Sequence, residues 1–317
     1  MDNFQKIVSS RGILRSCDIH NLEPRSSTTE LDFGGVVHQA GGSIYCCTDA
    51  LENFAEQMLD ALTIPFVLVS GDADSVVSPE GLGSRVFERI LNHPNLLRWY
   101  AQHLDFHDPR LHVLPAGLDY HTLWEHPEVW GEAQKTSPFV QERVLLDLKA
   151  RSLPADRRKP LAYCNWHHSL DKPGRQDSPN RRIRQECLAQ VDKSVCYYEP
   201  AFLPRFRAWE KQREFAFVLS PDGNGPDSHR TWESLVLGCV PIVKRNFMSD
   251  FLHDLPVIVV EDWREISAAT LQQSLAALSR EKFNFSKLYL EYWRKAIRGG
   301  APEGFAPLSM AEFLEML

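Results

Sequence analysis

Short apolar runs alternate with amphipathic segments along most of the chain, and this alternation restricts the fold more than any other feature. In the first half, apolar runs at 41–49 and 66–69 are each followed by a segment whose apolar residues recur at helical spacing, and another run lies at 111–114. The pattern restarts at 160–166 and continues through the second half. Strands that alternate with helices predict a parallel sheet joined by crossovers, so we expect an α/β protein.

A polar stretch at 127–160 interrupts this alternation and has the composition of a connector, apart from one amphipathic helix predicted at 138–150. The chain has 317 residues, which exceeds the usual size of a single domain. We therefore predict two Rossmann-like, doubly wound domains that face a cleft, with ligands outside the carboxyl ends of the strands. The predicted domains are residues 1–150 and 151–285, and the final helix, about 286–317, is expected to pack back on the first domain.

The composition argues against several classes of partner. With a net charge of −7, nothing marks nucleic acid or an anionic membrane as a ligand. The seven cysteines form no CxxC motif, so buried thiols in a reducing compartment are expected rather than disulfides or a zinc site. The N-terminal stretch "MDNFQKIVSSRGILRS" has no apolar run long enough for a signal peptide or a membrane anchor. The expectation is a cytoplasmic protein without a membrane span.

The most unusual polar stretch is "SPDGNGPDSHR", residues 220–230, which follows an apolar run at 215–219. That run is predicted to be a buried central strand. The glycines of the polar stretch permit positive φ angles, and a helix is expected to begin near Asp227 or Ser228, both good N-caps. A glycine-bearing turn between the end of a strand and the start of a helix presents backbone N–H groups, so it predicts an anion site.

Charged side chains at the start of this helix extend the predicted anion site. His229 and Arg230 add side-chain donors, and arginine binds phosphate through two hydrogen bonds. Glu233 lies one turn after His229 on the same face, where a carboxylate suits the paired hydroxyls of a ribose. The stretch therefore predicts a site for a nucleoside diphosphate. A solvated loop with an ordinary cap is the alternative, because the glycine spacing is neither GxGxxG nor a Walker A motif.

The longer stretch "FVLSPDGNGPDSHRTWESLVLGCVPIV" resembles the donor-binding domain of the exostosin-like glycosyltransferases, family 47. That domain carries the pattern S-P-x-G-x-G-x-D-x-H-R-x-W-E-x-L-x-x-G-x-x-P-I-V. Weaker matches at "FVLVSGDADSVV", "LHVLPAGLDYHTL" and "LAYCNWHHS" extend the resemblance over about residues 60–265. It implies a GT-B fold, inversion at the sugar carbon, and no essential metal or cofactor. It also makes 1–150 the acceptor side and 151–285 the domain that binds the nucleotide sugar.

The resemblance assigns roles to residues that match the motif. Glu233 corresponds to the ribose ligand, and His229 and Arg230 correspond to the pair that faces the diphosphate. Asp227 matches the family aspartate and is expected mainly to cap the helix. Asp222 departs from the family pattern, in which many relatives carry a basic or small residue, and is expected to point away from the phosphates. The predicted donor-binding residues are Ser220, Gly223, Asn224, Gly225, His229, Arg230 and Glu233.

Two further residues are predicted to reach the donor from the first part of the second domain. Arg181 opens a helix that also carries Arg182 and Arg184, and it is the preferred one because it is expected to lie nearest the loop. Asn165 ends the preceding predicted strand. A solvated helix start with one salt bridge is the alternative for the arginines.

Inverting transfer needs a general base from the acceptor side, usually Asp, Glu or His. Asp72 and Asp74 follow the buried run at 66–69, and the alternation of a strand would let both point the same way. Asp74 is the predicted base and Asp72 the fallback, with Arg230 stabilising the departing diphosphate. Two turn-forming aspartates are the alternative. Three more residues are predicted to line the acceptor side or to serve structure alone: His38, Asp119 and His121.

Adjacent His167 and His168 are expected to point apart, and no third ligand lies at a useful spacing, so no metal site is predicted. Trp166 is the tryptophan most expected to stack on a base or a sugar. The sequence thus predicts a metal-independent, inverting hexosyl- or pentosyltransferase. It would move a sugar from a nucleotide-diphosphate donor, with a UDP-sugar favoured, to a hydroxyl of a glycan or glycolipid acceptor. The alternatives are a non-catalytic protein that binds nucleotide sugars and a nucleotide-sugar epimerase of the same fold.

Overall fold

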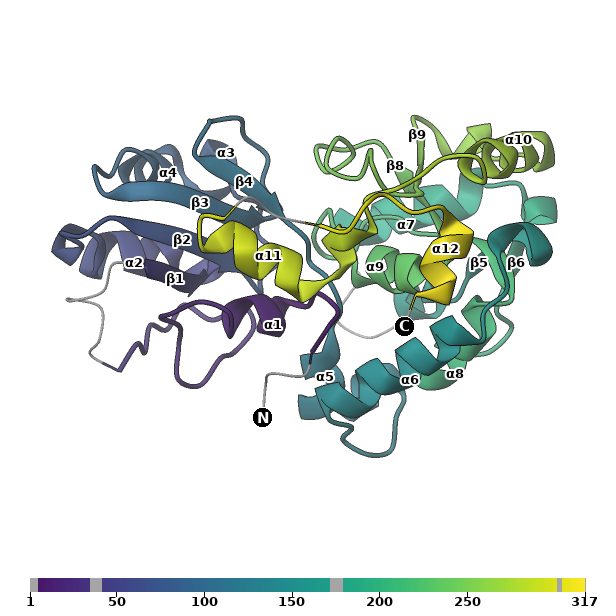
Figure 1. Ribbon diagram of the computed structural model, residues 1–317, viewed down its shortest axis with the longest axis horizontal. Helices are drawn as coiled ribbons and strands as arrows, with labels where there is room; N and C mark the ends of the chain where they lie inside the picture. The colour runs from purple at the N-terminus through teal and green to yellow at the C-terminus, as the bar shows by residue number, and fades with distance from the viewer. Residues whose placement is uncertain (1–4, 35–41, 172–178, 301–303, 317) are drawn as a thin grey trace. The chain divides into compact units, whose positions relative to one another are not determined.

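The computed structural model describes residues 5–34, 42–171, 179–300 and 304–316, and it is a mixed α/β structure with two parallel sheets (Figure 1). The α/β class predicted from the alternation is therefore confirmed. The chain divides into two compact units, each built around one sheet. Unit 1 comprises Met1–Gly117, Gly225–Asp227 and Tyr289–Gly304, and unit 2 comprises Leu118–Asn224, Ser228–Leu288 and Phe305–Leu317.

The sheet of unit 1 has four parallel strands in the order β1-β2-β3-β4. This order follows the sequence without a reversal among the described strands, and the parallel sheet is compatible with the predicted Rossmann-like unit. The periodicity of the sequence identifies strands but does not contain their order. The strands are β1 (Gly42–Cys47), β2 (Phe66–Gly71), β3 (Leu96–Gln102) and β4 (Leu111–Leu114), and the helices between them are α2 (Leu51–Gln57), α3 (Pro79–Leu82) and α4 (Ser84–Leu91), with 3₁₀ turns η2 (Thr48–Ala50) and η3 (Leu59–Ala61).

Helices cover both faces of this sheet. Trp99 of β3 packs against Phe87 of α4, with ring centroids 5.6 Å apart. Neighbouring side chains on a strand point to opposite faces. The next residue, Tyr100, donates its hydroxyl to the carbonyl of Ala296 in α11 (Leu290–Ile297) at 2.9 Å. Helix α11 therefore covers the other face, beside α1 (Ser10–Leu14) (Figure 1).

The sheet of unit 2 has five parallel strands in the order β6-β5-β7-β8-β9. The chain runs from β5 to β6 on one side and then returns to β7 on the other, so the strand order reverses next to β5. In doubly wound sheets such a reversal marks the crevice where ligands bind, at the carboxyl ends of the two strands beside it. The strands are β5 (Lys159–Cys164), β6 (Cys196–Tyr198), β7 (Phe215–Leu219), β8 (Val240–Lys244) and β9 (Ile258–Val260).

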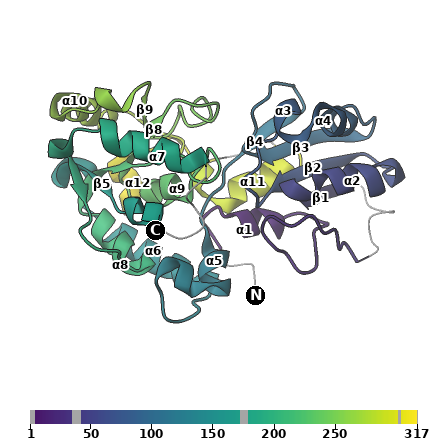
Figure 2. The same ribbon diagram turned by 180° about the vertical axis from the view of Figure 1, so that it is seen from behind.

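In unit 2 the long helix α6 lies beside the shorter helix α8 (Figures 1 and 2). The α-helices are α5 (Tyr120–Glu125), α6 (Pro138–Ala150), α7 (Pro179–Gln190), α8 (Arg205–Gln212), α9 (His229–Val236), α10 (Ala268–Leu278) and α12 (Met310–Glu315). The 3₁₀ helices are η4 (Pro127–Trp130), η5 (Ala155–Arg157), η6 (Trp166–Asp171), η7 (Lys193–Val195), η8 (Trp263–Glu265) and η9 (Phe285–Leu288).

The boundary between the units differs from the predicted one. Residues 118–150 belong to unit 2, because α6 packs on α5, α8, α9 and α12. Gln141 of α6 donates to the carbonyl of Tyr120 at 2.8 Å. The ammonium of Lys149 donates to the carbonyl of Met316 and lies 4.3 Å from the centre of the Phe313 ring. Residues 305–316 therefore pack on unit 2, whereas the prediction placed the whole segment of about 286–317 on the first domain.

Most predicted elements occur where the periodicity indicated them, and those at 111–114 and 138–150 coincide with β4 and α6. All seven cysteines are buried and free, which confirms the prediction of buried thiols. Within the described ranges, no helix combines the length and the apolar character needed to cross a bilayer.

Candidate functional site

The candidate site of unit 2 lies where its strand order reverses. Trp166, just after β5, donates its indole N–H to the carbonyl of Leu219 at the end of β7, at 2.9 Å. The hydroxyl of Ser220 lies 2.8 Å from that of Thr231 in α9. These contacts hold the carboxyl ends of β5 and β7 and the first turns of α9 close together. The predicted loop therefore follows one of the two strands that the reversal marks.

Helix α9 begins as the sequence suggested, with Ser228 as its N-cap. The Ser228 hydroxyl accepts a hydrogen bond from the backbone N–H of Arg230 at 3.4 Å. Asp227 is not the cap, and this part of the prediction is wrong. Its carboxylate accepts from the backbone N–H of Ala116 at 2.7 Å, and both residues belong to unit 1.

The glycines of the loop do not share one environment. Gly225 belongs to unit 1, and a β-carbon added there would lie 2.4 Å from Nε2 of His103. The absence of a side chain at Gly225 thus has a packing reason within unit 1, besides the predicted approach to a donor. Gly223 is buried, whereas Asn224 is exposed.

Arg230 lies under the loop that precedes its helix. One of its terminal nitrogens donates to the carbonyl of Pro221 at 3.0 Å, and its guanidinium lies 5.6 Å from the centre of the Trp166 ring. Burial lowers the pKa of Arg230, and nearby Cys164 and Glu233 act to raise it. Arginine remains charged at neutral pH even so. The site therefore carries a fixed positive charge beside the N-terminus of α9.

A second arginine touches the loop, and it is Arg184 rather than the predicted Arg181. Arg184 donates from Nε to the carbonyl of Asp222 at 3.2 Å and from Nη1 to the hydroxyl of Ser169 at 3.0 Å. Residues three apart lie about one turn apart on a helix, so sequence proximity alone did not indicate which arginine faces the loop. Arg181 is half-buried at the start of α7, and Asn165 is half-buried directly after β5. The Asp222 carboxylate accepts from the side-chain amide of Asn246 at 3.2 Å.

Glu233 forms a short ion pair with Arg205, the first residue of α8. Their Oε1 and Nη2 atoms are 2.6 Å apart, and the side chains are 11% and 2% exposed, respectively. The guanidinium of Arg205 packs over two indole rings, 4.3 Å from the centre of Trp130 and 4.8 Å from that of Trp209. Its Nη1 is also 4.0 Å from a carboxylate oxygen of Asp119.

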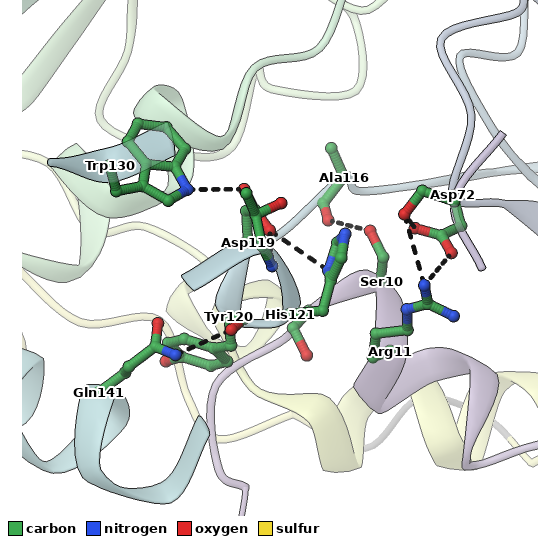
Figure 3. Close-up of polar contacts among 12 residues, drawn as sticks. Ser10, Arg11, Asp72, Ala116, Asp119, Tyr120, His121, Trp130 and Gln141 are labelled. Atoms are coloured by element: carbon green, nitrogen blue, oxygen red, sulfur yellow. Dashed lines mark hydrogen bonds and ion pairs between the residues drawn. The ribbon is translucent and has the colours of Figure 1, made fainter. Parts of the chain in front are cut away.

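Asp119 caps helix α5 and lies beside this ion pair. It accepts from the backbone N–H of Thr122 at 3.0 Å and from the indole of Trp130 at 3.2 Å, and His121 Nδ1 is 3.3 Å from its Oδ1 (Figure 3). Burial acts to raise the pKa of Asp119, but His121, His229 and Arg205, in that order of effect, and the backbone N–H of Thr122 outweigh burial and hold the pKa well below its usual range.

We call these five residues the Arg205 cluster: Asp119, His121, Arg205, His229 and Glu233. All five belong to unit 2. The prediction that Asp119 and His121 belong to the first domain is therefore wrong, because the boundary precedes them. The structure brings them together with Glu233 and His229, which the sequence assigned to the other side of the site.

Unit 1 contains the two predicted bases, and they differ. Asp72 is buried, with φ at +60°, and its carboxylate lies 3.2 Å from a guanidinium nitrogen of Arg11 (Figure 3). It also accepts from the hydroxyl of Ser26 at 3.0 Å, and its backbone N–H donates to the side chain of Gln102 at 2.8 Å. Asp74 is exposed. The two do not share one orientation, because the left-handed backbone at Asp72 ends the alternation of the strand.

Three further predictions concern histidines and metals. His38 lies outside the described residues. The rings of His167 and His168 are 4.1 Å apart, so the expectation that they point apart is wrong. His168 lies 3.0 Å from the carbonyl of Glu199, and His167 lies 3.6 Å from the thiol of Cys164. Over the described ranges, no group of three or more His, Cys, Asp or Glu side chains is arranged to hold a metal ion.

Sequence reasoning missed Arg205, although a signal for it exists. The buried residues of α8 are Arg205, Ala208, Trp209 and Gln212, which recur at helical spacing. A charged residue on the buried stripe of an amphipathic helix needs a partner of opposite charge. The spacing of apolar residues in α8 therefore indicates that Arg205 is a buried cation with an acidic partner.

Comparison with models of known protein families gives no match for this chain, and comparison with curated proteins gives none either. The chemistry of the site is therefore argued from its geometry and from the motif at 217–243.

Proposed function

We propose that this protein is an inverting, metal-independent glycosyltransferase of the exostosin-like type with a GT-B fold. It moves a sugar from a nucleotide-diphosphate donor, with a UDP-sugar favoured, to a hydroxyl of a glycan or glycolipid. One observation carries the proposal. At the reversal of strand order in unit 2, helix α9 begins directly after the loop that follows β7, and its first two turns carry Arg230 and Glu233.

The proposed role of this arrangement is to bind the diphosphate and stabilise it as it departs. The N-terminus of a helix carries partial positive charge and backbone donors, which favour a phosphate group. Arg230 adds a positive charge that its hydrogen bond to the carbonyl of Pro221 holds in place. Charges held in position before the reaction stabilise the transition state strongly, because they need not reorganise as the sugar–phosphate bond breaks.

The proposed general base is Asp74, which is exposed just after β2. It takes the proton of the acceptor hydroxyl while that oxygen bonds to the anomeric carbon. As this new bond forms, the bond from the anomeric carbon to the diphosphate breaks on the opposite face, the diphosphate leaves with the bonding electron pair, and the configuration inverts. Asp72 is a weaker candidate, because its carboxylate is buried against Arg11.

The test measures nucleotide binding and sugar transfer in the same variants. A thermal-shift screen of UDP, GDP, ADP and CDP, followed by their sugar conjugates, is expected to show stabilisation by one nucleotide class, because a ligand that binds only the folded state raises stability. Arg230→Ala is expected to lower turnover about 10²–10³-fold. Arg264→Ala, at an exposed arginine of the same unit, is the matched control and should retain turnover. No stabilisation by any nucleotide, or full turnover in Arg230→Ala, would refute the proposal.

The burial of Asp72 favours a second candidate, a non-catalytic protein that binds nucleotide sugars. Of the two predicted bases, only Asp74 remains exposed. Nucleotide-sugar binding without transfer to any acceptor of a broad panel, in wild type and in Asp74→Asn alike, would support this candidate. Conversion of the donor sugar in the absence of acceptor would instead indicate an epimerase.

A further inference from the structure

Arg205 is buried in a way that fixes its orientation. Its guanidinium packs over the indole rings of Trp130 and Trp209, and its side chain is almost completely inaccessible. Guanidinium groups stack well on aromatic rings and do not lose their proton in proteins. Among the described residues its Nε and Nη1 have no hydrogen-bond acceptor, and Nη2 reaches Glu233. The one short contact of this cation is therefore the carboxylate of Glu233.

Glu233 is held from one side only. Its Oε1 accepts from Arg205 at 2.6 Å, which is its one hydrogen bond within the described part of the chain. A carboxylate has two oxygens and room for about four hydrogen bonds. The Glu233 side chain also keeps some solvent exposure, unlike that of Arg205. An oxygen of Glu233 thus remains able to accept hydrogen bonds from a ligand.

A purely stabilising role does not explain this arrangement well. Two carboxylates, Glu233 and Asp119, lie within 4.0 Å of the one guanidinium of Arg205. Removing charged groups from water is costly, and replacing a buried ion pair with apolar residues is often neutral or stabilising. Arg205 orients the Glu233 carboxylate through one of its oxygens. An uncharged ligand that donates two hydrogen bonds, such as a vicinal diol, therefore suits this carboxylate.

We propose that Arg205 is a positioning residue that orients the carboxylate of Glu233 toward the ribose hydroxyls of the nucleotide, and so sets the preference for a ribonucleotide donor. This inference rests on the proposed function, because it requires that a nucleotide binds next to α9. Arg205 itself does not touch the ligand. It fixes the plane of the carboxylate from behind, and Asp119 holds the other side of the guanidinium.

The experiment compares binding of UDP, 2′-deoxy-UDP and 3′-deoxy-UDP by calorimetry to the full-length protein. Wild type is expected to prefer UDP over either deoxy nucleotide by about tenfold to a hundredfold, as a hydrogen bond to a charged group predicts. Glu233→Gln and Arg205→Met are expected to bring this ratio near one, and Arg205→Lys should restore part of it. Arg207→Ala, at an exposed arginine of the same helix, is the matched control and should keep the full ratio.

The ratio of affinities separates positioning from general stability. If Arg205 served structure alone, its variants would weaken all three nucleotides equally and keep the preference, and the inference would be wrong. Should Arg205→Met fail to fold, Arg205→Lys and Glu233→Gln still measure the ratio. UDP binding without any preference in wild type overturns the inference and leaves the proposed function intact. Absence of binding by any ribonucleoside diphosphate overturns both.

Discussion

Among its described residues, each unit contains a buried arginine paired with a carboxylate, and the two pairs are built differently. In unit 1, Arg11 and Asp72 have side chains that are 7% and 4% exposed. The Asp72 carboxylate also accepts from Ser26, and its backbone is hydrogen-bonded on both sides. In unit 2, the Arg205 side chain is 2% exposed and the Glu233 side chain is 11% exposed, and the Glu233 carboxylate has one hydrogen bond in the described part of the chain. The pair of Arg11 and Asp72 is thus enclosed within unit 1, whereas the Glu233 carboxylate in unit 2 remains accessible to a ligand.

The comparison predicts different costs when the arginine is removed. Arg11→Met should lower the free energy of unfolding by about 3–5 kcal/mol, because Asp72 is then left as an uncompensated buried charge. Arg205→Met should cost less, about 1–3 kcal/mol, because Glu233 can recover hydration at its exposed edge. Urea denaturation of both variants measures the difference. Equal costs would mean that the pair of Arg205 and Glu233 is as well shielded from solvent as the pair of Arg11 and Asp72.

A double variant tests whether the unit 1 cost arises from the unpaired charge. Arg11→Met combined with Asp72→Asn should recover part of the loss, since neighbouring residues in one ion pair are not additive. If the double variant were as unstable as the sum of the two single variants, packing rather than charge would dominate at this position.

The acid stability of unit 2 should depend on Asp119. Because the folded-state pKa of Asp119 is depressed, the unfolded chain binds the proton more readily. The stabilisation is present above the unfolded pKa, about 4, and is lost as pH falls through the lower folded pKa. Free energies of unfolding at pH 6, 4 and 3 should decline less steeply in Asp119→Asn than in wild type. Parallel declines in the two proteins would contradict this account of the Arg205 cluster.

Local sequence patterns predicted the helices and strands of this fold. The assignment of these elements to units and the order of the strands depend on contacts between residues that are distant in sequence. Helical spacing identified 138–150 as a helix, but its assignment to unit 2 depends on packing against α8 and α12, which are distant in sequence. Likewise, strand periodicity does not predict the order of strands in a sheet. The sequential order in unit 1 could therefore not be distinguished from an order with a reversal, such as that of unit 2.

The same limit applies to the candidate site. The helix start with Ser228 and Arg230 was predictable, because a cap and its helix are neighbours in the chain. Arg205 was missed because its partner Glu233 lies 28 residues away on another helix. The burial of Asp72 was missed because a positive φ angle at a residue other than glycine is uncommon and leaves little trace in sequence.

Unit 1 should tolerate added side-chain volume poorly where Gly225 packs against His103. A methyl group at Gly225 would lie 2.4 Å from the ring of His103, which has a positive φ angle of 54°. Gly225→Ala is therefore expected to destabilise the protein by about 1–3 kcal/mol, as overpacking does in well-packed sites. The same substitution in a His103→Gly background should cost less, because the ring is gone and glycine accepts the positive φ. An equal cost in both backgrounds would show that the strain arises elsewhere.

The last prediction concerns the thiol of Cys47, which donates to the carbonyl of Asp72 at 3.7 Å. Its reactivity therefore reports on how well the pair of Arg11 and Asp72 is shielded from solvent. Burial raises the pKa of Cys47 to about 11, and the charge of Asp72 contributes in the same direction. Because the thiolate is the reacting form, alkylation by iodoacetamide at pH 8 should be about 10²-fold slower in the native protein than in urea. Peptide mass spectrometry follows Cys47 separately from its neighbour Cys46.

In Arg11→Met, Asp72 loses its partner and the surrounding region should open more often. The alkylation rate of Cys47 in the folded protein should therefore rise, whereas Arg205→Met should leave it unchanged. Equally fast labelling of Cys47 in folded and unfolded wild type would mean that Asp72 is not enclosed, and the contrast between the two ion pairs would fail.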